Sequence, residues 1–190
     1  SVSLAELTST PLTVLDPAIV RARAAAIEVL ALDVDGTLTD GRIYIGPQGE
    51  VMKAFSVRDG FGLTLLREAG LKLAIITARQ SAIVEQRARE LGIATVMQGV
   101  RDKRQGIEAL CAELKVAPGN VGFAGDDWTD LPAMLAVGFA ATVADASAAV
   151  RERAHWVSAL PAGAGAIREL AEFILDSRGE LQAALERRLP

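Results

Sequence analysis

This sequence of 190 residues has a single cysteine, few aromatic residues and no long uninterrupted apolar run. Because Cys111 is the only cysteine, no disulfide can form within one chain, and we expect a reducing compartment. Aromatic residues make up only 4% of the chain, so aliphatic residues must supply most of the core. The longest apolar-looking run, 131–144, contains Pro132, Gly138 and Thr142 and is too short for a membrane helix.

The sequence also lacks a strong charge of one sign and a targeting segment. A net charge of −4, from 20 basic and 24 acidic side chains, argues against a general nucleic-acid-binding protein. No basic segment followed by an apolar stretch opens the sequence, so we expect no signal peptide. These features predict a soluble, cytoplasmic protein whose partners include neither nucleic acid nor a membrane.

The length and composition predict one domain over residues 1–190. With 51% hydrophobic and 23% charged residues, a chain of this size can bury roughly 70% of its unfolded surface. Compact apolar runs predict strands at 28–34, 71–76, 93–97, 120–124, 139–143 and 155–157. Segments between them predict helices at 18–26, 60–69, 81–91, 103–114, 129–136, around Val150 and at 164–175. Such alternation is typical of an α/β protein with a doubly wound parallel sheet and helices on both faces.

One segment interrupts the alternation. Residues 41–53 have two short β-prone arms around the turn Gly46-Pro47-Gln48-Gly49, which predicts a β-hairpin. This hairpin would form a flap between the first strand and the helix that follows it. The charged tail, 177–190, is expected to be either a loose helix or disordered.

Acidic residues follow two of the predicted strands. The sequence DVDGT contains Asp33 and Asp35, and the sequence GDDWTD contains Asp126, Asp127 and Asp130. In a doubly wound sheet, the carboxyl ends of the strands are where ligands bind. Clustered carboxylates need a cation or protons to neutralise them, and hard oxygen ligands suit Mg²⁺. Turn formation and helix capping are the alternative for each of these residues, and Asp127 and Asp130 could equally support a metal ligand or cap a helix.

Thr77 and Lys103 lie at the ends of other predicted elements. Thr77 ends a strand and begins the next helix, where its hydroxyl and neighbouring N–H groups could bind a phosphate or simply cap the helix. Lys103 stands at a helix start, where a cation opposes the helix dipole unless an anion lies nearby. The alternative for Lys103 is a solvated surface lysine.

These four features, in this order, resemble the haloacid dehalogenase-type phosphatases, whose Rossmann-like fold would cover nearly the whole chain. The resemblance implies that Asp33 is the nucleophile and that Asp35 is the acid and base. It implies that Mg²⁺ is held by Asp33, the backbone carbonyl of Asp35 and Asp126. Thr77 and Lys103 would then bind the phosphoryl oxygens.

Four longer segments resemble the 3-deoxy-D-manno-octulosonate 8-phosphate phosphatases: TDG at 39–41, KAFSVRDG at 53–60, GDD at 125–127 and GAIRE at 165–169. The resemblance implies hydrolysis of that sugar phosphate in lipopolysaccharide biosynthesis, a hairpin in place of a cap domain, and a homotetramer. It also implies a substrate pocket lined by Ser56, Val57, Arg58, Asp59 and Gly60, with Arg79 and Arg87 meeting the anionic sugar acid. Capping of the following helix is the alternative role for Asp59.

Two positions depart from that group. Ala78 stands where those phosphatases usually have glycine, and Ala164 stands where many have arginine. The first departure could narrow backbone freedom beside the phosphate, and the second removes a cation that could hold the sugar carboxylate. Two other functions stay open. One is a phosphatase for a related nine-carbon nonulosonate phosphate. The other is a non-catalytic domain that keeps this fold for assembly.

Overall fold

The computed structural model describes residues 15–190, which contain a six-stranded, all-parallel sheet with the strand order β5-β4-β1-β6-β7-β8. The strands are β1 (Val29–Leu32), β4 (Lys72–Ile76), β5 (Thr95–Met97), β6 (Val121–Ala124), β7 (Phe139–Thr142) and β8 (Trp156–Val157). All four residues of β1 are buried, as expected for a central parallel strand covered on both faces. Each predicted strand is present, and each is one to three residues shorter than the predicted run.

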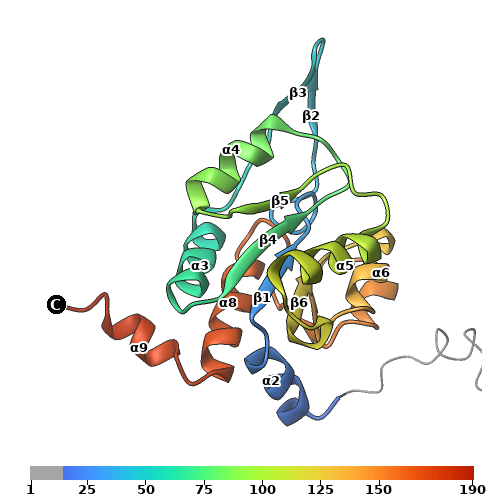
Figure 1. Cartoon of the computed structure of the whole chain (residues 1–190). Coiled ribbons are helices and arrows are strands. Elements are labelled where there is room, and N and C mark those ends of the chain that lie inside the picture. The colour runs from blue at the N-terminus through green and yellow to red at the C-terminus, as the bar shows by residue number, and fades with distance from the viewer. Residues whose placement is uncertain (1–14) are drawn as a thin grey trace, which may run out of the picture.

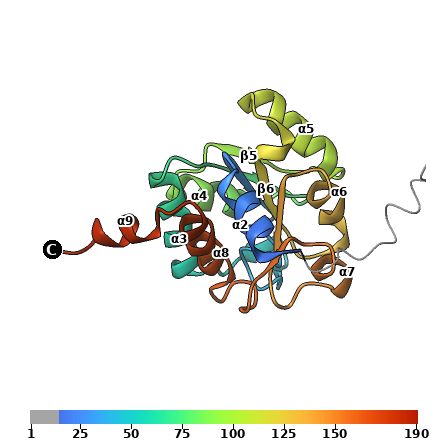
Figure 2. The same ribbon diagram turned by 90° about the horizontal axis from the view of Figure 1, so that it is seen from below.

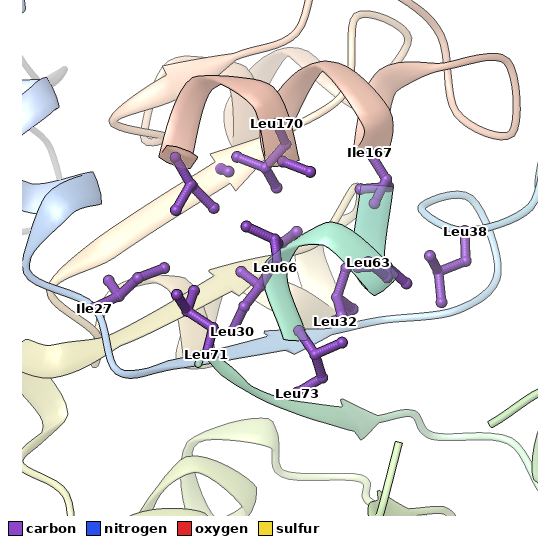
Figure 3. Packing of buried hydrophobic residues seen from close by; sticks show 14 of the residues in the cluster. Ile27, Leu30, Leu32, Leu38, Leu63, Leu66, Leu71, Leu73, Ile167 and Leu170 are labelled. Carbon is purple, nitrogen blue, oxygen red and sulfur yellow. The ribbon is translucent and has the colours of Figure 1, made fainter. Parts of the chain in front are cut away.

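Helices cover both faces of this sheet (Figures 1 and 2). One face carries α2 (Pro17–Ala25), α3 (Val57–Glu68), α4 (Ala82–Leu91) and α8 (Ala166–Ser177), and the other carries α5 (Lys103–Leu114), α6 (Leu131–Met134) and α7 (Ala148–Arg151). Side chains of β1 alternate between the two layers. Leu30 and Leu32 pack on the α3 and α8 side, where Figure 3 shows Leu30 beside Leu66 and Leu32 beside Leu63, whereas Ala31 packs on the α5 side. The predicted doubly wound architecture is therefore confirmed.

Three predicted helix boundaries need correction. Helix α3 begins at Val57 with Ser56 as its N-cap, so Asp59 lies inside the first turn and does not cap its own helix. Helix α4 begins at Ala82 with Ser81 as its N-cap, so Thr77 does not start a helix. The single helix predicted at 129–136 is a 3₁₀ turn, Trp128–Asp130, followed by the one-turn α6, because the Asp130 carboxylate folds back onto the preceding backbone.

The predicted hairpin is present as β2 (Tyr44–Gly46) and β3 (Gly49–Met52), which form a separate two-stranded antiparallel sheet. It projects from the body of the molecule at the top of Figure 1. Its apolar side chains face solvent: Ile45 is 73% exposed, Val51 57% and Met52 54%. A two-stranded hairpin is marginally stable alone, and this one carries an exposed apolar surface.

The charged tail contains the short helix α9 (Leu181–Glu186), which extends away from the sheet in Figure 1. This outcome favours the helical alternative for the tail. Within residues 15–190, no helix has the length and apolar character needed to cross a membrane.

Gly138, which precedes β7, provides a stability test of this packing. A Cβ on Gly138 would lie 1.9 Å from the carbonyl oxygen of Gly119, which is backbone and cannot swing away. We expect Gly138→Ala to lower the free energy of unfolding by about 2–3 kcal/mol. Gly119→Ala is the matched control, because a Cβ there meets no heavy atom within 4 Å. In urea unfolding, only Gly138→Ala should lose stability. Equal free energies of unfolding for the two variants would contradict this packing.

Candidate active site

The candidate site lies where the winding of the sheet reverses. From β1 the chain proceeds to β4 and β5 on one side, and then crosses to β6 on the other side. Ligands of doubly wound sheets bind at the carboxyl ends of the strands beside such a switch point. A cavity of about 180 Å³ lies there, and its lining residues are Asp33, Asp35, Thr77, Ala78, Arg79, Lys103, Asp126, Asp127 and Thr129. The fold therefore brings the two acidic clusters to one cavity.

The turn after β1 places Asp33 and Asp35. The carbonyl oxygen of Val34 accepts hydrogen bonds from the backbone N–H groups of Thr37, Leu38 and Thr39, which fixes the chain in a compact turn. Gly36 has a φ of +82°, and a Cβ there would lie 2.1 Å from Oδ2 of Asp126. Glycine is thus required both for the backbone conformation and for the close approach of the second acidic loop.

Lys103 is the buried cation of the site. Its Nζ lies 2.8 Å from Oδ1 of Asp33 and 2.5 Å from Oδ1 of Asp130, and the side chain is only 2% exposed. Burial lowers the pKa of Lys103, but the charges of Asp33 and Asp130 outweigh this effect and raise it, so the ammonium is retained. The alternative of a solvated surface lysine is wrong.

Asp130 organises the second acidic loop. Its Oδ1 accepts from Lys103, and its Oδ2 accepts from the backbone N–H groups of Asp126 and Asp127 at 2.8 and 3.1 Å. These contacts occupy both oxygens of a fully buried carboxylate, so Asp130 supports the loop and the lysine. Asp127 is exposed and caps the 3₁₀ turn through the N–H of Trp128.

The site holds more negative charge than Lys103 balances. Asp33, Asp126 and Asp130 each offer an oxygen within 4.8 Å of the others. Burial and the charge of Asp130 raise the pKa of Asp33 to about 6, although Lys103 opposes the shift. Burial, the charges of Asp130 and Asp33 and a hydrogen bond with Asp33 raise the pKa of Asp126 to about 8. A divalent cation would relieve this excess, so the donor set fits Mg²⁺.

Thr77 lines the cavity from the end of β4, but it is not at a helix N-terminus. Its N–H donates to the carbonyl of Met97 within the sheet, and the loop 77–81 separates it from α4. The neighbouring Ala78 has an ordinary backbone conformation, since Lys115 is the one non-glycine residue with positive φ in the described part of the chain. Alanine in place of glycine therefore adds no backbone strain here.

Asp35 is paired with a lysine from the hairpin. Nζ of Lys53 lies 2.5 Å from Oδ1 of Asp35 and 3.0 Å from Oε2 of Glu50. Oε1 of Glu50 accepts from the hydroxyl of Ser81 at 2.5 Å, and Arg79 lies within 4 Å of both Asp35 and Glu50. Lys53, Glu50 and Ser81 were not among the residues predicted for the site. The one available signal was the opposite charge of Glu50 and Lys53, three residues apart in the second arm of the hairpin.

The residues expected to bind the sugar are divided between two places. Arg79, which is half-exposed, reaches the acidic cavity, whereas Ser56, Asp59, Gly60 and Arg87 line a separate small cavity. Val57 and Arg58 face solvent. One chain alone therefore does not bring the segment 56–60 or Arg87 to the acidic cavity.

Asp59 caps a helix other than its own. Its Oδ1 accepts from the N–H of Arg168 at 3.0 Å, in the first turn of α8, and the backbone N–H groups of Gly165, Ile167 and Arg168 favour its ionised form. Burial raises the pKa of Asp59 despite these hydrogen bonds. Asp59 thus joins α3 to the N-terminus of α8.

Comparison with known proteins assigns the family. Residues 50–138 match the model of haloacid dehalogenase-like hydrolases. The 3-deoxy-D-manno-octulosonate 8-phosphate phosphatase of Yersinia pestis is 43% identical over 162 residues, which make up 85% of this chain and 87% of that protein. The chain belongs to the family of 3-deoxy-D-manno-octulosonate 8-phosphate phosphatases. The phosphatase of this name from Escherichia coli K12 is 42% identical over 163 residues, 86% of this chain and 87% of the relative.

Solved structures of the family share the fold. The Yersinia pestis phosphatase superposes with a TM-score of 0.84 over 86% of this chain and 89% of its own, at 43% identity. The Moraxella catarrhalis phosphatase, at 36% identity, superposes with a TM-score of 0.89 over 92% of this chain and all of its own. That protein was solved in complex with a magnesium ion, a phosphate ion and a KDO molecule. These similarities confirm the predicted haloacid dehalogenase-type fold.

Proposed function

We propose that this protein is a Mg²⁺-dependent phosphatase that hydrolyses 3-deoxy-D-manno-octulosonate 8-phosphate to the free sugar acid and phosphate, in lipopolysaccharide biosynthesis. The observation that carries the proposal is the buried contact between Lys103 and Asp33, beside Asp126, in a chain 43% identical to a phosphatase of that name. This arrangement combines a carboxylate nucleophile, a cation for phosphoryl oxygens and ligands for a metal ion.

Asp33 is the nucleophile in this proposal. Its carboxylate oxygen attacks the phosphorus, and an aspartyl-phosphate forms as the bond from phosphorus to the sugar oxygen breaks. Lys103, held 2.8 Å from Asp33, neutralises the oxygens of the transferring phosphoryl group, and the Thr77 hydroxyl donates to them. A fixed ammonium in a buried site stabilises that charge more strongly than it would in water.

Asp35 moves the protons. It donates a proton to the leaving sugar oxygen, and then takes one from the water that attacks the aspartyl-phosphate, which returns Asp33 as a carboxylate. Asp35 follows Asp33 by two residues and lines the same cavity, so both reach one substrate phosphate.

The side chains of Asp33 and Asp126, with the backbone carbonyl of Asp35, would hold Mg²⁺ in this protein. When bound, the ion supplies the positive charge that lets an anionic nucleophile approach an anionic phosphate. Asp130 supports this arrangement by fixing the backbone of Asp126, and Asp127 by capping the turn that follows.

The sugar end of the substrate is an anion, and Arg79 at the cavity mouth is the cation placed to meet it. We assign Arg87 and the segment Ser56, Val57, Arg58, Asp59 and Gly60 to the sugar pocket of a neighbouring subunit, because one chain keeps them apart from the acidic cavity. The pocket is then completed only in an assembly of several copies. A cytoplasmic location is part of the same proposal.

A side-by-side assay of eight-carbon and nine-carbon sugar-acid phosphates tests the substrate. We expect Mg²⁺-dependent phosphate release from both, with the higher kcat/KM for 3-deoxy-D-manno-octulosonate 8-phosphate. A preference for the nine-carbon compound would reassign the substrate. The absence of turnover with either would favour a non-catalytic assembly domain.

Metal exchange gives a prediction about the ion. Turnover should require Mg²⁺, and Ca²⁺ should support little turnover even where it binds. Calcium is larger and accepts irregular coordination, so the nucleophile and the phosphorus would be held less well in line. Phosphate release after chelation, and after adding each ion back, checks this expectation. Full activity in the chelated enzyme would contradict the metal role of Asp33 and Asp126.

The exposed hairpin gives a prediction about assembly. We propose a homotetramer in which four hairpins pack together through Ile45 and its apolar neighbours. Ile45→Asp should dissociate the assembly and raise KM, because a neighbouring subunit then no longer completes the sugar pocket. Light scattering and kinetics check both effects, with Arg42→Ala, an exposed change on the same segment, as the control. A fully active monomer at assay concentration would contradict the proposal.

A further inference from the structure

Lys53 follows the last strand of the hairpin, yet its charge is buried in the catalytic domain. The side chain is 1% exposed and its Nζ contacts two carboxylates, Oδ1 of Asp35 at 2.5 Å and Oε2 of Glu50 at 3.0 Å. Lysine is almost never this buried unless it is paired. The carboxylate of Asp35 is therefore paired with a buried ammonium group.

Glu50, the second partner of Lys53, is itself held by the loop after β4. Glu50 accepts from the hydroxyl of Ser81, the N-cap of α4, at 2.5 Å. Arg79 lies 3.6 Å from Glu50 and 3.7 Å from Asp35. The two cations and two carboxylates alternate in sign, so each charge faces an opposite one.

This cluster connects the hairpin to two loops at the carboxyl edge of the central sheet. Asp35 belongs to the turn after β1, Glu50 and Lys53 to the hairpin, and Arg79 and Ser81 to the loop 77–81. The hairpin forms its own sheet and shares no ladder with the central one. The orientation of the Asp35 side chain is thereby linked to the base of the hairpin.

We propose that Lys53 is the positioning residue of Asp35: it holds Oδ1, fixes the carboxylate in one orientation, and so directs Oδ2 to the substrate oxygen. This inference rests on the proposed acid and base role of Asp35. Glu50 and Ser81 act one step further away, by holding Lys53 in place. The hairpin then contributes to proton transfer through Lys53 as well as to assembly.

A double-mutant cycle tests whether Lys53 acts through Asp35. In the wild-type background, Lys53→Met should lower kcat for 3-deoxy-D-manno-octulosonate 8-phosphate by about 10- to 100-fold and change KM by less than about twofold, because a displaced carboxylate loses its alignment. In an Asp35→Asn background, measured with excess enzyme, Lys53→Met should cause less than about a twofold further loss. Lys72→Met, a change of an exposed lysine on β4, is the matched control and should leave both backgrounds unchanged.

A second variant keeps the test decisive if Lys53→Met does not fold. Glu50→Gln retains the ammonium but weakens its anchor, so it should lower kcat by about three- to tenfold, again only when Asp35 is present. Equal losses in both backgrounds, or a loss of melting temperature with unchanged kcat, would overturn the role of Lys53. Turnover by the wild-type enzyme in the same experiment reports separately on the proposed function.

Discussion

Asp33→Asn should reduce phosphate release by at least about a thousand-fold, because an amide oxygen does not attack phosphorus. The fold should be retained, since asparagine has the shape of aspartate and Lys103 keeps its contact with Asp130. Without metal, the variant should melt at the same or a higher temperature, because one negative charge leaves an over-acidic cluster. Steady-state kinetics, circular dichroism and thermal unfolding measure the three effects.

Asp176→Asn is the control for this experiment. Asp176 is an exposed residue that pairs with Arg21 at 2.8 Å and has no contact with the cavity. Its replacement should leave turnover unchanged. If Asp33→Asn keeps more than a few per cent of wild-type activity once deamidation has been excluded, Asp33 is not the nucleophile.

The second large effect is expected at Lys103. Lys103→Met should lower kcat by at least about a hundred-fold, because the phosphoryl oxygens lose their buried cation. In the metal-free protein it should also cost about 3 kcal/mol of unfolding free energy, since breaking a buried pair leaves carboxylates uncompensated. Lys72→Met again serves as the control.

The stability loss at Lys103 should depend on pH. In the folded state, the pKa of Asp33 is about 6 and that of Asp126 about 8, both above the ordinary value of 3.8. A carboxyl group whose pKa is higher in the folded than in the unfolded state stabilises the fold at low pH. This contribution is lost as the pH rises through the pKa of the folded state. Removing Lys103 takes away a charge that lowers the pKa of Asp33, so the penalty should grow from pH 5 to pH 8. Urea unfolding in chelator at both pH values checks this, and a penalty that shrinks with pH would contradict it.

The local sequence pattern was enough to predict the strands of the sheet and the acidic residues that line the cavity. The runs that became β1 and β6 are apolar because both of their faces are buried, and the carboxylates come directly after them. Since parallel strands end at the same edge, residues separated by 93 positions, such as Asp33 and Asp126, could be expected at one site. The inference needed only the position of each acidic residue directly after a strand of a parallel sheet.

Contacts between distant segments were not visible in the sequence. Asp59 was expected at the start of its own helix, but its carboxylate caps α8, more than a hundred residues further on. Thr77 was expected to begin the next helix, but a loop separates it from α4, and Ser81 is the N-cap. The pairing of Lys53 with Asp35 depends on how the hairpin folds back onto the domain, which no local pattern encodes.

Trapping the covalent intermediate tests the central claim most directly. An Asp35→Asn variant keeps the nucleophile but lacks both the acid for the leaving sugar oxygen and the base for hydrolysis. Phosphoryl transfer is then slow, but over a long incubation with excess substrate the phosphoryl group that forms should remain on the enzyme. After rapid acid quench from 3-deoxy-D-manno-octulosonate 8-phosphate and Mg²⁺, borohydride reduction and peptide mass spectrometry would locate it. We expect a single modified position, Asp33, and no modification when Asp33 is also replaced. A phosphoryl group on any other residue, or none while the wild-type enzyme turns over, would contradict this claim.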